Sequence, residues 1–168
     1  MSTHESRLVE LEARVRVVED LHAISQLVAS YGPAVDSGSA EAAGALWTDD
    51  GVFDVVPWFE LQGPVGVAGM VDMDGHQQVI QNGCGHVLTA PKVELHGDDA
   101  TAWNYAFHIR FDADADRFWI ARLSANEWRC RREPEGWRVV RRTNVNLDGN
   151  DAARALLGRA SQGPKEAR

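Results

Sequence analysis

The sequence predicts an α+β fold in which helices come first and pack on one face of an antiparallel sheet. Two observations carry this prediction. The first third of the chain shows helical spacing of apolar residues, and the part from residue 86 onward consists of β-rich segments separated by turns. Helices followed by a strand meander are typical of a sheet covered by helices on one face. The length of 168 residues suits one domain of this kind.

The segment 5–31 is predicted to be helical. Its first part carries apolar residues at 3,4,3 spacing: Leu8, Leu11, Val15 and Val18. The apolar face that continues from Leu21 is offset in phase, which predicts two helical pieces joined near Glu19-Asp20. The first piece could pack on a partner subunit or on its own domain. The chain is therefore expected to divide into an N-terminal helical extension, a central domain, and a short C-terminal helix with a polar tail: residues 1–18, 19–150 and 151–168.

The pair Gly32-Pro33 is predicted to break or distort this helix. Proline lacks the N–H that an interior helical turn needs, and it disfavours helical geometry at the preceding residue. On an unbroken helix, Tyr31 and Asp36 would lie about 140° apart. A distorted turn could rotate Asp36 toward the side of Tyr31. The alternative is a solvated aspartate near the helix end, which is the default for this residue type.

The remaining elements are bounded by turn signals. Residues 40–51 predict a short helix with Ser39 as N-cap and a turn at 49–51, and a short strand follows over 52–56. Residues 63–83 look helical in their second half, although four glycines precede Gly83. After residue 86, three turns separate strands that are long enough for a strongly curved sheet: 97–99, 112–116 and 133–136.

His86 opens a predicted strand, directly after two glycines that flank Cys84. Alternation places it on one face with Leu88 and Ala90. A histidine on an apolar strand face is more often a hydrogen-bonded core residue than a catalyst. If the carboxylate of Asp36 reaches its ring, however, the pair becomes a general base with an orienting acid.

His108 lies on a later strand whose two faces differ. It shares one face with Asn104 and Arg110, whereas the aromatic face, which includes Tyr105 and Phe107, is the expected core. His108 could therefore be exposed or line a polar cavity. The other histidines are expected at the surface: His4, His22, His76 and His96.

The last strand alternates two sets of residues. Trp137, Val139 and Arg141 share one face, and Arg138, Val140 and Arg142 share the other. Strict alternation thus places Arg141 with the large apolar residues. A buried arginine there would need a carboxylate or a substrate anion as its partner. The alternative is an arginine with a buried stem and a solvated head.

Composition excludes several classes of partner and site. The net charge of −8 and the isoelectric point of about 5.2 argue against nucleic acid or an anionic membrane as the main partner. Two isolated cysteines suggest no disulfide framework, and no histidine spacing suggests a metal site. The chain lacks a nucleophile elbow, a phosphate loop and a dinucleotide fingerprint. With no signal peptide and no membrane-length apolar run, a cytoplasmic protein is expected.

Three features together resemble the SnoaL-like branch of the nuclear-transport-factor-2-like superfamily. They are the helix with Tyr31 and Asp36 followed by "LWTDDGVFD", the histidine that opens the strand leading to "VELHGDDA", and the closing "GWRVVRR". The resemblance covers residues 15 to 147 in outline. It implies a cone-shaped α+β barrel, in which a strongly curved antiparallel sheet wraps around helices and encloses an apolar pocket. This fold hosts several reactions and also non-catalytic binders.

Within this superfamily the sequence is most similar to scytalone dehydratase, hexachlorocyclohexane dehydrochlorinase and the bile-acid dehydratases. In that group a histidine paired with an aspartate removes a proton next to the leaving group. The resemblance places the base, its carboxylate, a helix tyrosine and a pocket arginine on this chain at His86, Asp36, Tyr31 and Arg141. Arg142 is an alternative for the arginine, and a second pocket histidine falls on His108. Pocket walls for an apolar substrate are expected from four further residues: Trp47, Phe53, Trp58 and Met70.

The resemblance, together with these residues, implies a cofactor-independent lyase that acts by dehydratase-like elimination on a small apolar cyclic or steroid-like molecule. His86 suits the base, and Tyr31 could stabilise developing negative charge. An isomerase or polyketide cyclase with the same pocket is one alternative, and a non-catalytic binding or oligomerisation domain is another. Relatives imply a homo-oligomer, either a dimer or a trimer. Neither a metal nor any other cofactor is expected.

Overall fold

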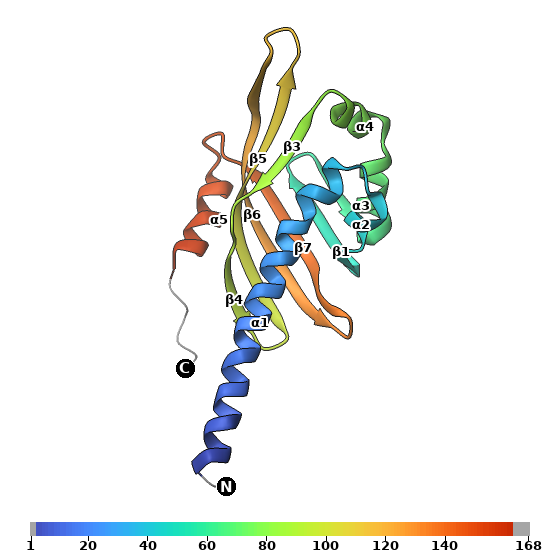
Figure 1. Ribbon diagram of the computed structural model, residues 1–168. Helices are drawn as coiled ribbons and strands as arrows, with labels where there is room; N and C mark the ends of the chain where they lie inside the picture. Colours follow the sequence, from blue (N-terminus) through green and yellow to red (C-terminus); the bar gives the residue numbers. More distant parts are fainter. Residues whose placement is uncertain (1–2, 163–168) are drawn as a thin grey trace.

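A computed structural model describes residues 3–162 of the chain (Figure 1). The helices are α1 (Thr3–Asp36), α2 (Ala40–Gly44), α3 (Gly63–Asp72), α4 (Asp74–Gln81) and α5 (Asp151–Ser161). The strands are β1 (Trp47–Val56), β2 (Phe59–Gln62), β3 (Cys84–Leu88), β4 (Lys92–His96), β5 (Asp99–Asp112), β6 (Arg117–Glu133) and β7 (Gly136–Asn146). Among these helices, none combines the length and the apolar character that crossing a membrane requires.

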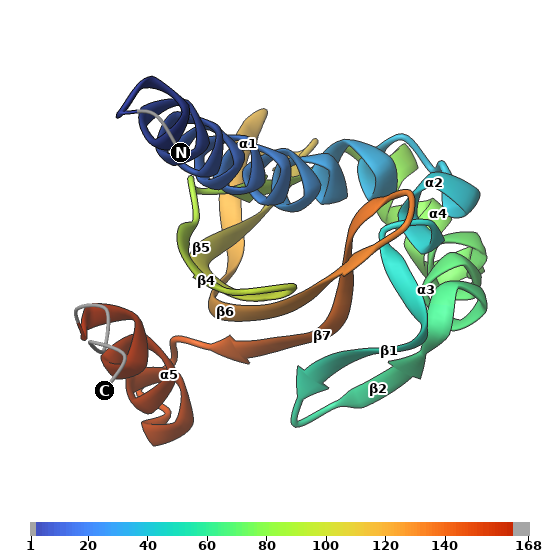
Figure 2. The same ribbon diagram turned by 90° about the horizontal axis from the view of Figure 1, so that it is seen from below.

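The strands form one sheet of seven, in the order β2-β1-β7-β6-β5-β3, with β4 paired to the first part of β5. Figure 2 shows the sheet curving around α1, while α5 lies on the opposite, outer side. This arrangement confirms the predicted α+β class and the strongly curved sheet. The parallel pairing of β1 with β7 was not predicted; all other neighbours are antiparallel.

Helix α1 is continuous, so the predicted division near Glu19-Asp20 is wrong. The change of apolar phase has another cause. Residues 3–19 are exposed and project beyond the sheet, whereas burial begins at Asp20 (Figure 1). Asp20 accepts two hydrogen bonds from the guanidinium of Arg132, at 2.7 and 2.6 Å, and a third from Nε1 of Trp137 at 3.1 Å. The helix therefore changes its surroundings at this point without changing its conformation.

The helix also continues through Gly32-Pro33 to Asp36, so the predicted break is wrong as well. Further along, residues 63–81 are helical in both halves, because α3 already begins at Gly63 with Pro64 in its first turn, where proline is well tolerated. Strand β2, which pairs with β1, was not anticipated.

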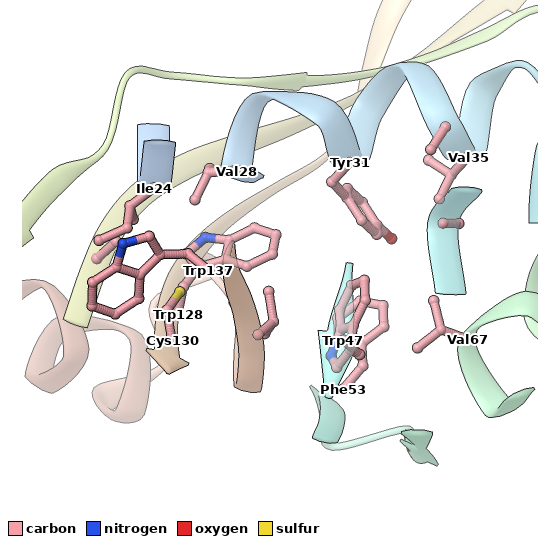
Figure 3. Close-up of a cluster of buried hydrophobic side chains, with 14 of the residues drawn as sticks. Ile24, Val28, Tyr31, Val35, Trp47, Phe53, Val67, Trp128, Cys130 and Trp137 are labelled. Atoms are coloured by element: carbon pink, nitrogen blue, oxygen red, sulfur yellow. The ribbon is translucent and has the colours of Figure 1, made fainter. Parts of the chain in front are cut away.

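The main core lies between α1 and the concave face of the sheet (Figure 3). Ile24, Val28 and Val35 of α1 are fully buried there, together with Trp128 of β6. The inward residues of β5 are small or polar and include Ala100, Ala102 and Asn104, which lets the helix approach. The aromatic face of β5 is therefore the outer face, contrary to the prediction, and Tyr105 is 43% exposed.

Candidate active site

A cavity of about 410 Å³ opens between the C-terminal half of α1, helices α3 and α4, and the sheet. One part of its wall is apolar and includes Phe53, Val55, Phe59, Met70 and Val79. The other part is polar and consists of Tyr31, His76, His86, His108, Arg110 and Arg122. A larger, open hollow of about 690 Å³ adjoins it and shares Val79 and Arg110. We place the site in the smaller cavity because only that one is lined by His86.

Asp36 and His86 form the central contact of the site. Nδ1 of His86 lies 2.5 Å from Oδ1 of Asp36, and the backbone N–H of His86 donates to Oδ2 at 2.6 Å. The His86 and Asp36 side chains are only 13% and 23% exposed. Since an ionised carboxylate can only accept, Nδ1 carries the hydrogen and Nε2 keeps its lone pair when the ring is neutral. This is the arrangement of a general base with an orienting acid.

The carboxylate is held in its ionised form. Burial by itself would raise the pKa of Asp36, but the hydrogen bonds from the ring and the backbone of His86 outweigh burial and lower that pKa below its usual range. The thiol of Cys84 also donates to Oδ1, at 3.7 Å. Asp36 is thus charged at neutral pH and stabilises the imidazolium that forms when His86 accepts a proton.

Gly32 explains how an unbroken helix brings Asp36 to His86. The two residues Gly32 and Asp36 are four apart and so lie on the same helix face, the one that meets β3. A Cβ added to Gly32 would lie only 2.3 Å from the carbonyl oxygen of His86. Glycine therefore permits a close approach of strand to helix rather than a bend, and Asp36 sits one turn beyond that contact.

Tyr31 reaches the same site from the neighbouring helix face. Its ring is 3% exposed and meets the His86 ring edge to face, with centroids 6.1 Å apart. Cζ of Arg142 lies 4.0 Å from the centre of the Tyr31 ring, and it also contacts Phe53 and Trp128. Burial lowers the pKa of Arg142 to about 10, which leaves it charged at neutral pH. The structure therefore brings together Asp36, His86 and Tyr31, with Arg142 behind the tyrosine.

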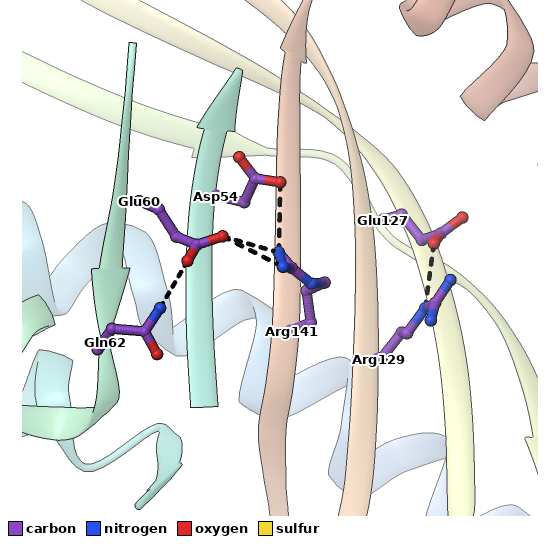
Figure 4. A network of polar contacts seen from close by, with 6 residues as sticks. All are labelled: Asp54, Glu60, Gln62, Glu127, Arg129 and Arg141. Atoms are coloured by element: carbon purple, nitrogen blue, oxygen red, sulfur yellow. Dashed lines mark hydrogen bonds and ion pairs between the residues drawn. The ribbon is translucent and has the colours of Figure 1, made fainter. Parts of the chain in front are cut away.

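Arg141 lies elsewhere. It contacts the carboxylates of Asp54 and Glu60, at 3.2 to 3.3 Å, on the outer side of the sheet (Figure 4). The cause is a β-bulge: Arg129 faces Arg141 but Cys130 faces Val139, so β7 carries one extra residue between them. A bulge reverses the alternation beyond it. Arg142, 2% exposed, therefore takes the inner face that alternation assigned to Arg141.

His108 lies within the cavity, directly beside the base. The His86 and His108 rings stack at 17°, with centroids 4.4 Å apart. Burial, followed by the nearby His86 and the arginines, lowers the pKa of His108 from 6.5 to about 4. His108 is thus neutral at neutral pH and places no second positive charge beside His86.

The expected pocket walls are only partly at the cavity. Phe53 and Met70 line it. Trp47 is 1% exposed and packs in the core behind Tyr31 and Phe53, at ring distances of 6.0 and 5.7 Å. Trp58 is 52% exposed and lies beneath the guanidinium of Arg122, 5.5 Å away.

His76 and Arg122 are among the lining residues that the sequence analysis did not identify. His76, expected at the surface, faces the cavity, and its Nε2 lies 3.0 Å from the carbonyl oxygen of Val35. Its helical spacing to Val79 and Ile80 is a signal that could have identified it. Arg122 pairs across the sheet with His108. No local signal could have identified Arg122, because the pairing depends on the register of β5 and β6.

Cys84, His86 and His108 offer potential metal ligands within 4.8 Å of one another. The two imidazole rings are nearly parallel, however, and Nδ1 of His86 is engaged by Asp36. Lone pairs lie in the plane of each ring, so stacked rings do not direct them at one ion as tetrahedral coordination requires. This geometry favours proton transfer over metal binding.

Comparisons with known proteins agree with this architecture. A sequence model of the SnoaL-like domain matches residues 16–143. An NTF2-like protein with a cystatin-like fold from Novosphingobium aromaticivorans is 43% identical, with a TM-score of 0.86 over 89% of this chain and 96% of that one. A search of curated proteins found no match.

Two further solved structures from the same organism share the fold. A candidate aromatic ring hydroxylase is 26% identical, with a TM-score of 0.63 over 77% of this chain and 90% of that one. A candidate scytalone dehydratase is 16% identical, with a TM-score of 0.67 over 80% of this chain and 88% of that one. At these identities the likeness confirms the curved α+β fold and leaves the reaction open.

Proposed function

The chain belongs to the SnoaL-like domain family, and we propose that it is a cofactor-independent lyase in which His86, oriented by Asp36, starts an elimination. The observation that carries the proposal is the 2.5 Å contact between these side chains at the wall of the cavity. If Asp36 were solvated instead, His86 would be a core histidine without an orienting carboxylate.

The reaction follows from the free nitrogen of the base. Nε2 of His86 takes a proton from a carbon next to an activating group, and the electrons of that C–H bond form a new double bond. The leaving group departs from the neighbouring carbon with its bonding electrons. If it is a hydroxyl group, it takes up a proton, which His86 can return, and leaves as water. The charge of Asp36 favours the protonated intermediate state of the ring.

Tyr31 is the proposed electrostatic partner. Its phenol can donate a hydrogen bond to an oxygen on which negative charge develops. Arg142 lies over the Tyr31 ring rather than at the cavity wall, so we assign it a positioning role. It fixes the ring and favours negative charge near the phenol.

The same base supports a second reaction type, isomerisation or cyclisation, if the proton returns to another carbon or the carbanion attacks a carbonyl. Products distinguish these from elimination. A domain that only binds or assembles would show no proton abstraction at all.

The decisive experiment follows solvent deuterium exchange by NMR in a panel of β-hydroxy ketones, hydroxy-steroid thioesters and halocyclohexanes. We expect exchange or elimination with at least one class, without added cofactor. His86→Gln should abolish it, whereas His96→Gln, at an exposed position on β4, should not. Turnover that survives His86→Gln would show that the base is misassigned.

We also propose that the protein is a homo-oligomer, a dimer or trimer. Large apolar residues are exposed at the end of the sheet formed by β5 and β6, among them Phe118 (70%) and Ile120 (57%). The first part of α1 exposes a second apolar row, which includes Leu11 and Val18. Exposed apolar groups that gather in this way commonly mark interfaces between protein chains.

A further inference from the structure

The cavity carries positive charge that the protein leaves unbalanced. Arg122 of β6 lines it, and Arg110 of β5 stands where the cavity meets the adjoining open hollow. Across residues 3–162, neither arginine forms an ion pair with a carboxylate; the nearby Asp36 is occupied by His86. This contrasts with the whole chain, whose net charge is −8.

Arg122 gives the stronger indication of a bound anion. Its Nε is buried and has no hydrogen-bond partner among the described residues. The Trp58 ring at 5.5 Å attracts the charge but cannot satisfy N–H donors. A half-buried guanidinium that has no carboxylate partner and one buried, unpaired N–H is unfavourable in the free protein, and a bound anion would relieve this cost.

The register places Arg122 at a defined separation from the base. His86 pairs with His108, and His108 pairs with Arg122, so the three form one row across β3, β5 and β6. Adjacent strands are about 4.8 Å apart, which puts the backbones of His86 and Arg122 roughly 10 Å from each other. Both side chains line the same cavity, so a single ligand can contact both.

We propose that the substrate is an anion: a cyclic molecule that bears one carboxylate or ionised phenol, which Arg122 binds while His86 acts on its far side. This inference rests on the proposed function and narrows it, because the apolar wall then holds the ring and the arginine selects its charge. Arg110, at the mouth, attracts the anion toward the cavity.

The test compares charged and neutral ligands of similar shape by isothermal titration calorimetry. The probes are benzoate against benzamide, and 4-nitrophenolate against 4-nitroanisole, so that the two pairs distinguish carboxylate from phenolate. We expect the wild-type protein to bind at least one anion about tenfold or more tightly than its neutral analogue, the value of one charge-assisted hydrogen bond.

Arg122→Gln should remove this preference, and Arg122→Met should do the same while preserving the packing of the stem. Arg117→Gln is the matched control, since Arg117 begins the same strand at an exposed position. His86→Gln should keep the preference, so a failure of the proposed elimination would leave this result readable.

Anions that bind no more tightly than their neutral analogues, or that do not bind at all, would overturn the inference. A preference that persists in both Arg122 variants would also overturn it. If neither variant folds, the wild-type protein still decides: the Arg122 Nε–H resonance should shift with benzoate and stay in place with benzamide.

Discussion

Replacing Gly32 with alanine tests how helix α1 delivers Asp36 to the base. Gly32 lies inside a helix, where alanine is favoured over glycine by about 0.5–1 kcal/mol. Local propensity alone therefore predicts that Gly32→Ala stabilises the protein. The structure predicts the opposite sign, because the new Cβ would lie 2.3 Å from the carbonyl oxygen of His86.

The size of the effect follows from the displacement that this contact forces. Ordinary contacts of this kind begin near 3.4 Å, so β3 must retreat by about 1 Å. Overpacking of this kind costs about 1–3 kcal/mol. The same shift stretches the 2.5 and 2.6 Å bonds between Asp36 and His86 toward the limit of hydrogen bonding. A weakened charge-assisted bond costs about 1.5–3 kcal/mol. After subtracting the helix propensity, we expect a net loss of about 2–5 kcal/mol.

Urea denaturation monitored by tryptophan fluorescence measures this change as a shift in midpoint at constant slope. Gly69→Ala is the matched control: it lies in helix α3, nothing lies within 4 Å of its added Cβ, and it should stabilise by about 0.5–1 kcal/mol. Misplacement of the base by about 1 Å should also lower any turnover by roughly 100-fold. If Gly32→Ala is as stable and as active as the wild type, our account of the helix–strand contact is wrong.

Three further predictions concern pH, helix docking and assembly. The pKa of His108 is about 4 in the folded protein and 6.5 in the unfolded chain, so the unfolded chain binds more protons between these values. The free energy of unfolding should therefore rise with pH across that interval. In His108→Gln, urea denaturation should show a weaker dependence of this free energy on pH. Hydrogen bonds from Arg132 lower the pKa of Asp20, so the stabilisation that the Asp20 carboxylate provides is present above about pH 4 and is lost as pH falls. Asp20→Asn should therefore lower the free energy of unfolding by about 1–3 kcal/mol at pH 7. The double variant with Arg132→Gln should lose less than the sum of the two single losses. Light scattering should show that Phe118→Asp combined with Ile120→Lys dissociates the oligomer if the sheet interface holds it, whereas Leu11→Glu should do so if α1 does.

The sequence predicted those parts of the fold that depend on local patterns. Helical spacing located α1, and turn signals located β5, β6 and β7. The resemblance then assigned Asp36 and His86, and the structure places them in contact. The reason given for Asp36 was nevertheless wrong: Gly32-Pro33 does not bend the helix, and Gly32 instead makes room for a strand that lies far away in the sequence.

The errors share one physical origin, the register between distant segments. Alternation along β7 placed Arg141 on the inner face of the sheet. A single extra residue in β7, opposite β6, puts Arg142 on that face instead. Alternation along β5 correctly separated two faces, but which face meets α1 depends on the close approach of that helix over small residues such as Ala102. Arg122 entered the site through its pairing with His108. A local window of sequence contains none of these relations.

The double role of Asp36 makes Asp36→Asn the most informative change at the site. The carboxylate accepts from both Nδ1 and the backbone N–H of His86. An asparagine can still accept from the backbone through its amide oxygen, but its NH₂ group would then face Nδ1. That contact favours the other neutral tautomer, with the hydrogen on Nε2, and removes the lone pair that takes the substrate proton.

We therefore expect Asp36→Asn to keep most of its stability and to lose turnover by roughly 1,000-fold or more. A loss of this size is typical when a general base is deprived of its orienting carboxylate. ¹⁵N NMR of the His86 ring should show the protonated nitrogen change from Nδ1 to Nε2. An inactive variant that retains the original tautomer would assign Asp36 a purely electrostatic role. An active variant with the exchanged tautomer would exclude Nε2 as the base.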